Sequence, residues 1–418
     1  MLSDEVLERL TERVVNRIEE ANTYTLKVIA KNIKKIGKLT PSDAQRIGQM
    51  LKYGGDYEKI INKLADVTKM NVKDIRKIFR ELASREYKTA KQFYDYRKVK
   101  YIPFDENVRL QRQVDALYRT AEKDYLNLSR TSSLGFGTID SVTGKTKFIS
   151  LKQAYYDAID KAVMSVSQGQ DTFDNQMRKL IKEMGSGGLK VIYPTTYKDK
   201  NGNIRHYSRR LDSAVRTNLK DALRTLHNEN QKLFGEEFRS DGVEISVHEQ
   251  PAPDHEDVQG RQFNNKEFDK LQQGKKAKDV NEVEYTLDHD NKNGYRAIGT
   301  LNCYHYIFSI VLGISKPIYS DEQLEKIKER NKDGFEFRGQ HYTLYQGTQL
   351  QRQIETEVRK AKDVQIMARE SGQENVVKEA QENISHLSKM YQELANASKL
   401  PTKKKRMSVP NYRRVAIK

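Results

Sequence analysis

The sequence predicts an α+β protein that is predominantly helical, in which a small α+β region is flanked by helices. At both ends of the chain, apolar residues recur every three or four positions, as in amphipathic helices. Only the middle combines glycines with alternating β-branched residues, the pattern of short strands. Of 418 residues, 36% are hydrophobic and 32% charged, which suits modest cores. We expect helices over 1–149, an α+β domain over 150–340, a helical hairpin over 341–400 and a basic tail over 401–418.

The net charge favours a polyanionic partner. It is +17 at pH 7, and each Lys or Arg placed near a phosphate releases condensed counterions, so the simplest partner is nucleic acid.

The single cysteine excludes internal disulfides, as is typical of proteins made in a reducing compartment. The start, "MLSDEVLERLTERVV", lacks the basic and then apolar pattern of a signal peptide, and no run approaches the roughly 20 apolar residues of a membrane span. We expect a soluble protein made inside the cell.

Two helix starts stand out in the first hundred residues. In 38–51, Thr40 occupies the N-cap position and Asp43 the acidic position of a capping box. In 70–82, Asn71 precedes a segment whose apolar residues share one face, which predicts a second capped helix. Short turns between such segments favour a small bundle.

The middle of the chain contains the strand signals. Segment 190–208 alternates around Asn201 and Gly202, a pair that favours a β-hairpin because both residues tolerate the positive φ of a type I′ turn. Segments 242–250 and 306–315 are short and apolar enough to be strands or core segments.

The last part of the chain predicts a helical hairpin and a tail. Segment 343–398 has helical spacing on both sides of a break at Ser371 and Gly372, so two antiparallel helices are expected. Segment 401–418 contains seven basic residues and no acidic one, and we expect it to be mobile and to bind phosphate.

A second basic feature lies in the helix expected over 209–234. Arg216, Lys220 and Arg224 are spaced i, i+4, i+8 and form a stripe that is either a solvated face or a contact for a polyanion. The candidate DNA-binding residues are therefore Lys403, Lys404, Lys405, Arg406, Arg413, Arg414, Arg216, Lys220 and Arg224.

The only cysteine, Cys303, lies two residues before His305, and His255 lies upstream. Structural zinc takes four ligands, usually in closely paired Cys or His motifs, and these residues supply three at most. Asp254, Asp257 or His289 could add a fourth, but no spacing points to them. We therefore expect no metal and no cofactor.

Catalysis and a structural role are the other two interpretations of these residues. A nucleophilic thiolate needs a neighbouring imidazole, which His255 could provide, but Cys303 precedes an apolar run where a thiol is more often buried and inert. Asn and His side chains also satisfy backbone groups in irregular loops. We expect a structural cluster and no catalytic residue, with Cys303 and His255 as the candidates for any chemistry.

The order of motifs resembles the minor capsid protein 2 family of tailed phages that infect Gram-positive bacteria and, more loosely, the Mu F-like head proteins. The resemblance covers roughly 150–400: a histidine and a Gln-Gly pair after a strand, an Asn-Cys-x-His element, and a Tyr-Thr-x-Tyr entry into a helical hairpin. The matching residues are His255, Gln259, Gly260, Asn302, Cys303, His305, Tyr342, Thr343, Tyr345, Gln349 and Arg352.

The resemblance implies a structural, non-enzymatic protein present in few copies in the phage head. It implies association with the portal protein and other capsid components at the portal vertex, and with packaged or entering double-stranded DNA without sequence preference. It also implies a location in the virion, and in the host cytoplasm during assembly. Because Mu F-like domains also occur in toxin-type proteins, the alternative is a nucleic-acid-directed enzyme or effector delivered with the genome, acting through Cys303 and His255.

Overall fold

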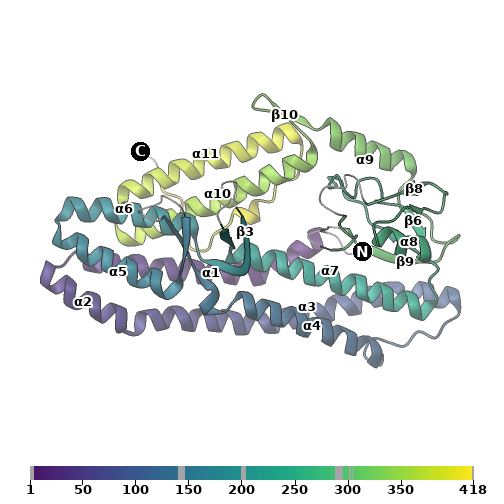
Figure 1. The fold of residues 1–418 in the computed structure, drawn as a ribbon, viewed down its shortest axis with the longest axis horizontal. Helices are drawn as coiled ribbons and strands as arrows, with labels where there is room; N and C mark the ends of the chain where they lie inside the picture. Colours follow the sequence, from purple (N-terminus) through teal and green to yellow (C-terminus); the bar gives the residue numbers. More distant parts are fainter. Residues whose placement is uncertain are drawn as a thin grey trace. The chain divides into compact units, whose positions relative to one another are not determined.

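The computed structural model describes residues 4–139, 146–198, 204–287, 295–300, 303 and 305–416. The chain is predominantly helical with small antiparallel sheets, which confirms the predicted fold class (Figure 1). No helix within the described ranges is both long and apolar enough to cross a membrane.

Helices account for most of the described chain. In chain order the α-helices are α1 (Asp4–Ile36), α2 (Pro41–Tyr53), α3 (Gly55–Arg97), α4 (Val108–Leu128), α5 (Leu151–Ser167), α6 (Gln170–Gly187), α7 (Leu211–Phe238), α8 (Asn265–Gln272), α9 (Asp321–Asp333), α10 (Leu344–Ser371) and α11 (Glu374–Ser398). Two 3₁₀ turns are η1 (Thr131–Ser133) and η2 (Lys404–Met407).

The strands form small sheets in which every pairing is antiparallel. They are β1 (Leu134–Ile139), β2 (Thr146–Ser150), β3 (Lys190–Lys198), β4 (Ile204–Arg210), β5 (Gly242–Ile245), β6 (Gln262–Asn264), β7 (Ala277–Lys278), β8 (Glu284–Tyr285), β9 (Ile307–Ile310), β10 (Phe335–Phe337) and β11 (Gln340–Tyr342). The strand orders are β2-β1-β3-β4, β6-β5-β9, β10-β11 and β7-β8.

One predicted helix start is confirmed and the other is wrong. The Thr40 hydroxyl accepts a hydrogen bond from the backbone N–H of Asp43 and caps α2. Asn71, in contrast, lies inside the continuous helix α3. Its buried amide donates to the Val14 carbonyl and to the Tyr125 hydroxyl, at 3.2 and 2.9 Å. The Asn71 side chain therefore bonds to residues distant in sequence and does not cap a helix.

The predicted β-hairpin is present as the pair β3 and β4. Thr196 lies opposite His206 and Lys198 opposite Ile204. Asn201 and Gly202, on which the prediction rested, lie outside the described residues.

Helices α10 and α11 form the predicted antiparallel hairpin (Figure 1). The Gln365 amide donates to Gln381 at 2.9 Å, and the Tyr391 hydroxyl donates to the Glu355 carboxylate, also at 2.9 Å. The earlier residue of α10 is thus paired with the later residue of α11, so the two helices run in opposite directions. The buried face of α11 contains the apolar residues of helical spacing: Val376, Ala380, Ile384, Leu387, Tyr391 and Leu394.

The basic C-terminal segment is anchored, whereas we expected a mobile tail. Arg359 donates to the Arg406 carbonyl at 2.6 Å and Lys362 to the Met407 carbonyl at 2.8 Å. Val409 is buried, and the Tyr412 hydroxyl donates to Gln381 at 3.0 Å. Side chains from the hairpin therefore satisfy backbone groups of this segment, which charge density alone does not predict.

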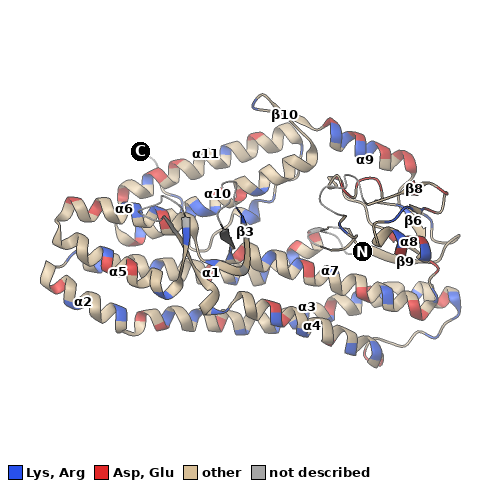
Figure 2. Cartoon of the chain, in the orientation of Figure 1, with Lys and Arg blue, Asp and Glu red and all other residues tan. Residues whose placement is uncertain are grey.

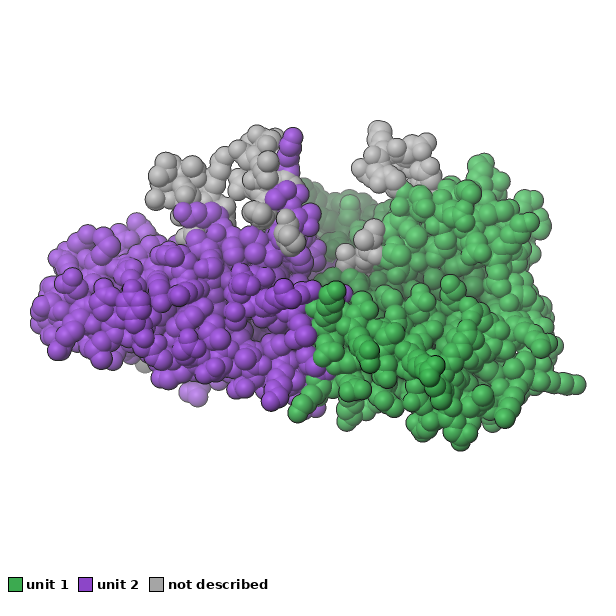
Figure 3. Space-filling view, turned by 60° about the horizontal axis from the view of Figure 1, so that its bottom comes forward, with its two compact units in different colours: residues 1–11, 73–123, 217–349 green, residues 12–72, 124–216, 350–418 purple. Residues whose placement is uncertain are grey.

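The chain divides into two compact units, coloured separately in Figure 3. Unit 1 contains residues 1–11, 73–123 and 217–349, and unit 2 contains residues 12–72, 124–216 and 350–418. Each unit gathers segments that are distant in sequence, whereas the division predicted above follows the chain. The candidate site lies in unit 1.

Unit 1 holds the small sheet β6-β5-β9 and its apolar core. Strand β5 is buried along its whole length, and α8 packs its two buried apolar residues against the same cluster. The core residues are Val243, Ile245, Val258, Phe263, Phe268, Leu271, Ala277, Leu287 and Ile298. Val258 and Ile298 come from loops, so this core fixes the loops beside the strands.

Figure 2 shows Lys, Arg, Asp and Glu interspersed along the helices. In unit 2, five of these charged side chains are buried together. Arg210 contacts Glu19 at 3.5 Å, Asp212 at 3.1 Å and Asp363 at 3.0 Å. Arg359 contacts Asp212 at 3.2 Å and Glu19 at 3.5 Å. All five side chains are buried.

Burial and the neighbouring charges shift the pKa values of the carboxyls in this network in different directions. Burial, and next the charge of Asp212, raise the pKa of Glu19 well above its usual value. Burial opposes ionisation of Asp212 as well, but the charges of Arg210 and Arg359 outweigh it and lower the pKa of that carboxyl. Burial also raises the pKa of the Asp363 carboxyl, and the charge of Arg210 opposes this shift.

The first prediction concerns Arg210. Arg210→Met should lower the free energy of unfolding by about 3–5 kcal/mol, because it removes the cation beside the buried Asp363 and leaves Asp212 with Arg359 alone. The matched control is Arg46→Met, which removes an exposed pair with Asp43 and should cost about 1 kcal/mol or less. Urea denaturation of both variants at pH 7 measures the difference. Equal losses would contradict a stabilising role for the buried network.

Candidate functional site

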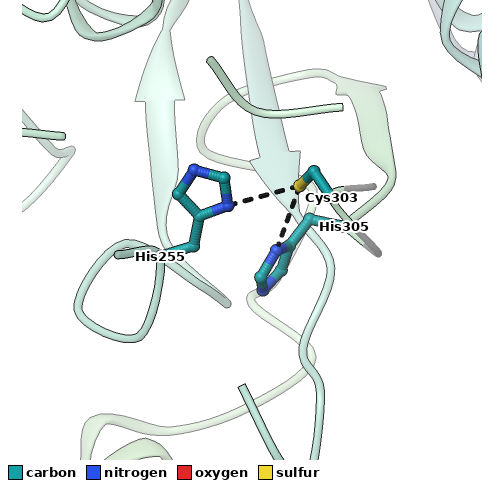
Figure 4. Close-up of side chains that lie close together, drawn as sticks. All are labelled: His255, Cys303 and His305. Carbon is teal, nitrogen blue, oxygen red and sulfur yellow. Dashed lines mark hydrogen bonds between the residues drawn. The ribbon is translucent and has the colours of Figure 1, made fainter. Parts of the chain in front are cut away.

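His255, Cys303 and His305 converge in unit 1 (Figure 4). The sulfur of Cys303 lies 3.3 Å from Nδ1 of His255 and 3.5 Å from Nδ1 of His305. The three side chains are at most 2% exposed, and one potential ligand atom from each lies within 4.8 Å of the others. The structure therefore brings together the three reactive side chains singled out in the sequence.

Strand pairing explains why distant residues meet here. In the antiparallel pair of β5 and β9, Ile245 lies opposite Ile307, so the end of one strand adjoins the start of the other. His255 follows β5 in sequence, and Cys303 and His305 precede β9. Just beyond the strands, Ser246 donates its backbone N–H to the Tyr306 carbonyl at 2.9 Å and accepts the Tyr306 N–H on its hydroxyl at 2.8 Å.

Gly260 fixes the loop that carries His255. Its φ of +71° lies in the left-handed region, and a Cβ atom there would lie 2.6 Å from Cδ2 of Leu324. The Gly260 N–H donates to the Ile245 carbonyl at 2.9 Å, which returns the loop to β5. A side chain at this position would disturb both the backbone and its packing.

The hydrogen bond to Arg296 sets the tautomer of His255. Nε2 lies 2.7 Å from the Arg296 carbonyl, which only accepts, so this nitrogen carries the hydrogen in neutral imidazole and Nδ1 presents a lone pair to Cys303. The Arg296 guanidinium in turn makes two 2.8 Å hydrogen bonds to Asp254. Nothing in the spacing of the sequence pointed to Arg296.

Gln259 sets the tautomer of His305 in the same way. Its Oε1 accepts the backbone N–H of His248 at 2.8 Å, which identifies that atom as the amide oxygen. Nε2 of His305 lies 3.4 Å from the same oxygen and must donate to it. Nδ1 of His305 therefore also presents a lone pair to the sulfur.

Burial determines the charge of the cluster. It lowers the pKa of His305 well below 6.5, and the neighbouring His248 and His255 add to this shift. Burial also raises the pKa of the Cys303 thiol. At neutral pH the site therefore holds a protonated thiol beside a neutral His305, the reverse of the thiolate–imidazolium pair of an activated nucleophile.

The other family-motif residues mainly organise the start of α10. The Thr343 hydroxyl accepts the N–H of Gln346 at 3.2 Å while the Gln346 side chain accepts the N–H of Thr343 at 2.9 Å, a reciprocal capping box. The N–H of Tyr345 donates to Asn331. Tyr342 ends β11, and Gln349 and Arg352 lie within α10. Asn302 and His289 lie outside the described residues.

The expected basic stripe of α7 is largely buried. Lys220 forms an ion pair with Glu8, and Arg224 pairs with Asp221 at 3.1 Å. Arg216 is half-buried. Among the C-terminal candidates, Arg406 is mostly buried and lies 3.7 Å from Glu355. The exposed candidates are Lys403, Lys404, Lys405, Arg413 and Arg414.

The second prediction uses the pKa of His305. Because its folded pKa lies below its unfolded value of about 6.5, the unfolded chain binds an extra proton as the pH falls below 6.5. This group should therefore remove up to about 1.4 kcal/mol of stability per pH unit below that point.

Denaturation at several pH values in chelator-containing buffer measures this slope. His305→Gln should have a shallower slope than the unmodified protein. His386→Gln, at an exposed position of α11, should retain the original slope. An unchanged slope in His305→Gln would mean that this imidazole is not buried in its neutral form.

Comparison with known proteins extends the resemblance to nearly the whole chain. The family described as Phage minor capsid protein 2 matches residues 2–396, including the N-terminal helices that showed no motif of their own. Neither the curated proteins nor the solved structures compared with the chain gave a match. The extent of the family match is decisive: the chain belongs to the phage minor capsid protein 2 family, and its role is that of a structural component of the phage capsid.

Proposed function

We propose that this capsid protein is present in few copies, associates with the portal vertex and contacts packaged or entering double-stranded DNA. The observation that carries the DNA contact is the C-terminal segment 401–418, which contains no acidic residue and exposes Lys403, Lys404, Lys405, Arg413 and Arg414. Lys405 also forms an ion pair with Glu12 at 3.1 Å. Segments of this charge bind phosphates largely without sequence preference, because counterion release supplies the free energy. The net charge of +17 supports the same partner.

The helical hairpin supports the proposed contact with a portal. Its α11 buries one face, while Lys378, Glu382 and Lys389 on the opposite face are exposed. An anchored amphipathic hairpin offers a rigid helical surface to another helical assembly, and its charged face favours a polar, reversible contact.

An enzymatic role is supported by one observation, the 3.3 Å contact between Cys303 and His255. Two others oppose it: the thiol is 1% exposed, and burial raises its pKa. A nucleophile needs the opposite shift and access to substrate. We therefore propose a structural role for this cluster and no catalysis.

The third prediction tests the location. In purified particles of the phage that encodes the chain, it should be present at a copy number comparable to that of the portal protein and far below that of the major capsid protein. Lysine-directed cross-linking should join Lys378 or Lys389 to the portal protein. A copy number similar to that of the major capsid protein, or cross-links to other components only, would contradict the portal proposal.

The fourth prediction tests the DNA contact. Replacing Lys403, Lys404 and Lys405 by Gln should weaken binding of the full chain to double-stranded DNA equally for different sequences. The slope of log K against log salt should become shallower by up to about 2.7, since each lost phosphate contact removes about 0.9. Fluorescence anisotropy over a range of salt concentrations measures both effects.

A charge-matched control separates local contact from net charge. Replacing the exposed α3 residues Lys69, Lys73 and Lys91 by Gln removes the same charge elsewhere and should leave the slope nearly unchanged. If both triple variants lose the same affinity, the contact is not made by the C-terminal segment.

A further inference from the structure

In the buried cluster, two imidazole nitrogens face one thiol. The carbonyl of Arg296 and the amide of Gln259 orient His255 and His305 so that both Nδ1 lone pairs face the sulfur of Cys303. A thiol has one hydrogen, which can be donated to one imidazole only. The sulfur then opposes the second nitrogen with a lone pair of its own. A cation between the three atoms would interact favourably with all of them.

The spacing fits a tetrahedral ion. With zinc bonds of about 2.3 Å to sulfur and about 2.0–2.1 Å to nitrogen, tetrahedral geometry places sulfur and nitrogen roughly 3.6 Å apart. The two observed separations are 3.3 and 3.5 Å, so the ligand atoms are already near their positions. Tetrahedral zinc holds two nitrogen ligands about 3.4 Å apart. The ligand atoms of the three residues lie within 4.8 Å of one another, so the imidazoles would have to approach each other by up to about 1.4 Å.

The surroundings of the cluster also match those of metal sites. Histidines that bind metals usually donate their other N–H to a backbone carbonyl, amide or carboxylate, which fixes the ring and its tautomer. His255 does so to Arg296, with the Asp254 carboxylate 3.7 Å from the same nitrogen. His305 does so to Gln259. Imidazole and thiolate together suit zinc and related borderline ions rather than calcium or magnesium.

We propose that Sγ of Cys303 and the Nδ1 atoms of His255 and His305 bind one zinc ion, with water as the fourth ligand. The sequence argued against a structural zinc site because it offers only three ligands. Zinc sites that keep one coordination position for water have three protein ligands. The number of ligands and their spacing here therefore fit a zinc ion whose fourth ligand is water.

Binding of the zinc ion is accompanied by the loss of one proton from the Cys303 thiol. The thiol gives up its hydrogen as the sulfur–zinc bond forms, and the imidazoles bind through existing lone pairs, so the ion releases one proton from the protein at neutral pH. The bound ion would join the loop after β5 to the segment before β9 more strongly than the present hydrogen bonds. The inference is independent of the portal and DNA contacts proposed above.

Cobalt titration of the metal-free, full-length protein tests the site. One Co²⁺ per chain should bind and produce a thiolate-to-cobalt absorption band together with the intense visible bands of tetrahedral cobalt. One equivalent of Zn²⁺ should displace it. A pH indicator should report one proton released per zinc ion. A folded protein that binds no ion, or binds one without the thiolate band, would overturn the proposal.

Single variants assign the ligands. Cys303→Ser should abolish the thiolate band, and His305→Gln should weaken zinc binding by on the order of 100-fold or more through the loss of one of three ligands. Gln259→Leu, which removes the hydrogen-bond partner of the His305 ring and of the His248 backbone but no ligand, should weaken zinc binding by roughly 10- to 100-fold. The control is His386→Gln, at an exposed position of α11, which should bind zinc as the unmodified protein does. Zinc affinity unchanged in His305→Gln would refute the assignment.

A measurement on the unmodified protein covers the case in which a variant does not fold. X-ray absorption of the zinc-loaded chain should show one sulfur neighbour at about 2.3 Å and three nitrogen or oxygen neighbours at about 2.0–2.1 Å. A shell of nitrogen and oxygen alone would place the ion elsewhere and overturn the proposal.

Discussion

Unit 2 depends on the pairing of buried Arg210 with acidic side chains from three helices, α1, α7 and α10. Glu19 comes from α1, Asp212 from the start of α7 and Asp363 from α10, so a single guanidinium connects elements that are far apart in sequence. Asp363 also accepts a hydrogen bond from Asn22 at 3.1 Å. A buried charge costs free energy unless every partner is present, so the network forms only when these segments are correctly placed. We infer that the network also selects the correct alignment of these helices, since a misaligned arrangement would leave buried charges unpaired.

In unit 1, hydrogen bonds between distant segments orient the side chains of the candidate site. Its sheet β6-β5-β9 has three short strands, and the segments that precede or follow them carry the reactive side chains. Gln259 joins the His248 backbone to the His305 ring, and the Arg296 carbonyl holds the His255 ring. These outer contacts, rather than the sheet, decide which nitrogen of each ring faces Cys303. The geometry of the cluster thus follows from residues that carry no reactive chemistry.

The parts of the fold that were predictable are those decided by local sequence. The Thr40 cap, the β3–β4 hairpin and the buried stripe of α11 follow from neighbouring residues and from periodicity. The start assigned to Asn71 was wrong because its amide binds Val14 and Tyr125, which are distant in sequence. The candidate residues Cys303, His255 and His305 could be named from the sequence, but their distances and tautomers depend on strand pairing and on Arg296, which has no local signal.

The distribution of charge connects the fold to its role in a capsid. Several buried cations are matched internally: Lys220 by Glu8, Arg224 by Asp221, and Arg210 and Arg359 by the acids around them. A matched cation is already neutralised and contributes little to attraction of a polyanion. The excess positive charge must therefore reside largely on exposed side chains, as the proposed DNA contact requires. Because Arg359 and Lys362 of α10 hold the backbone of the C-terminal segment, its exposed basic residues Lys403, Lys404, Arg413 and Arg414 are held beside the hairpin.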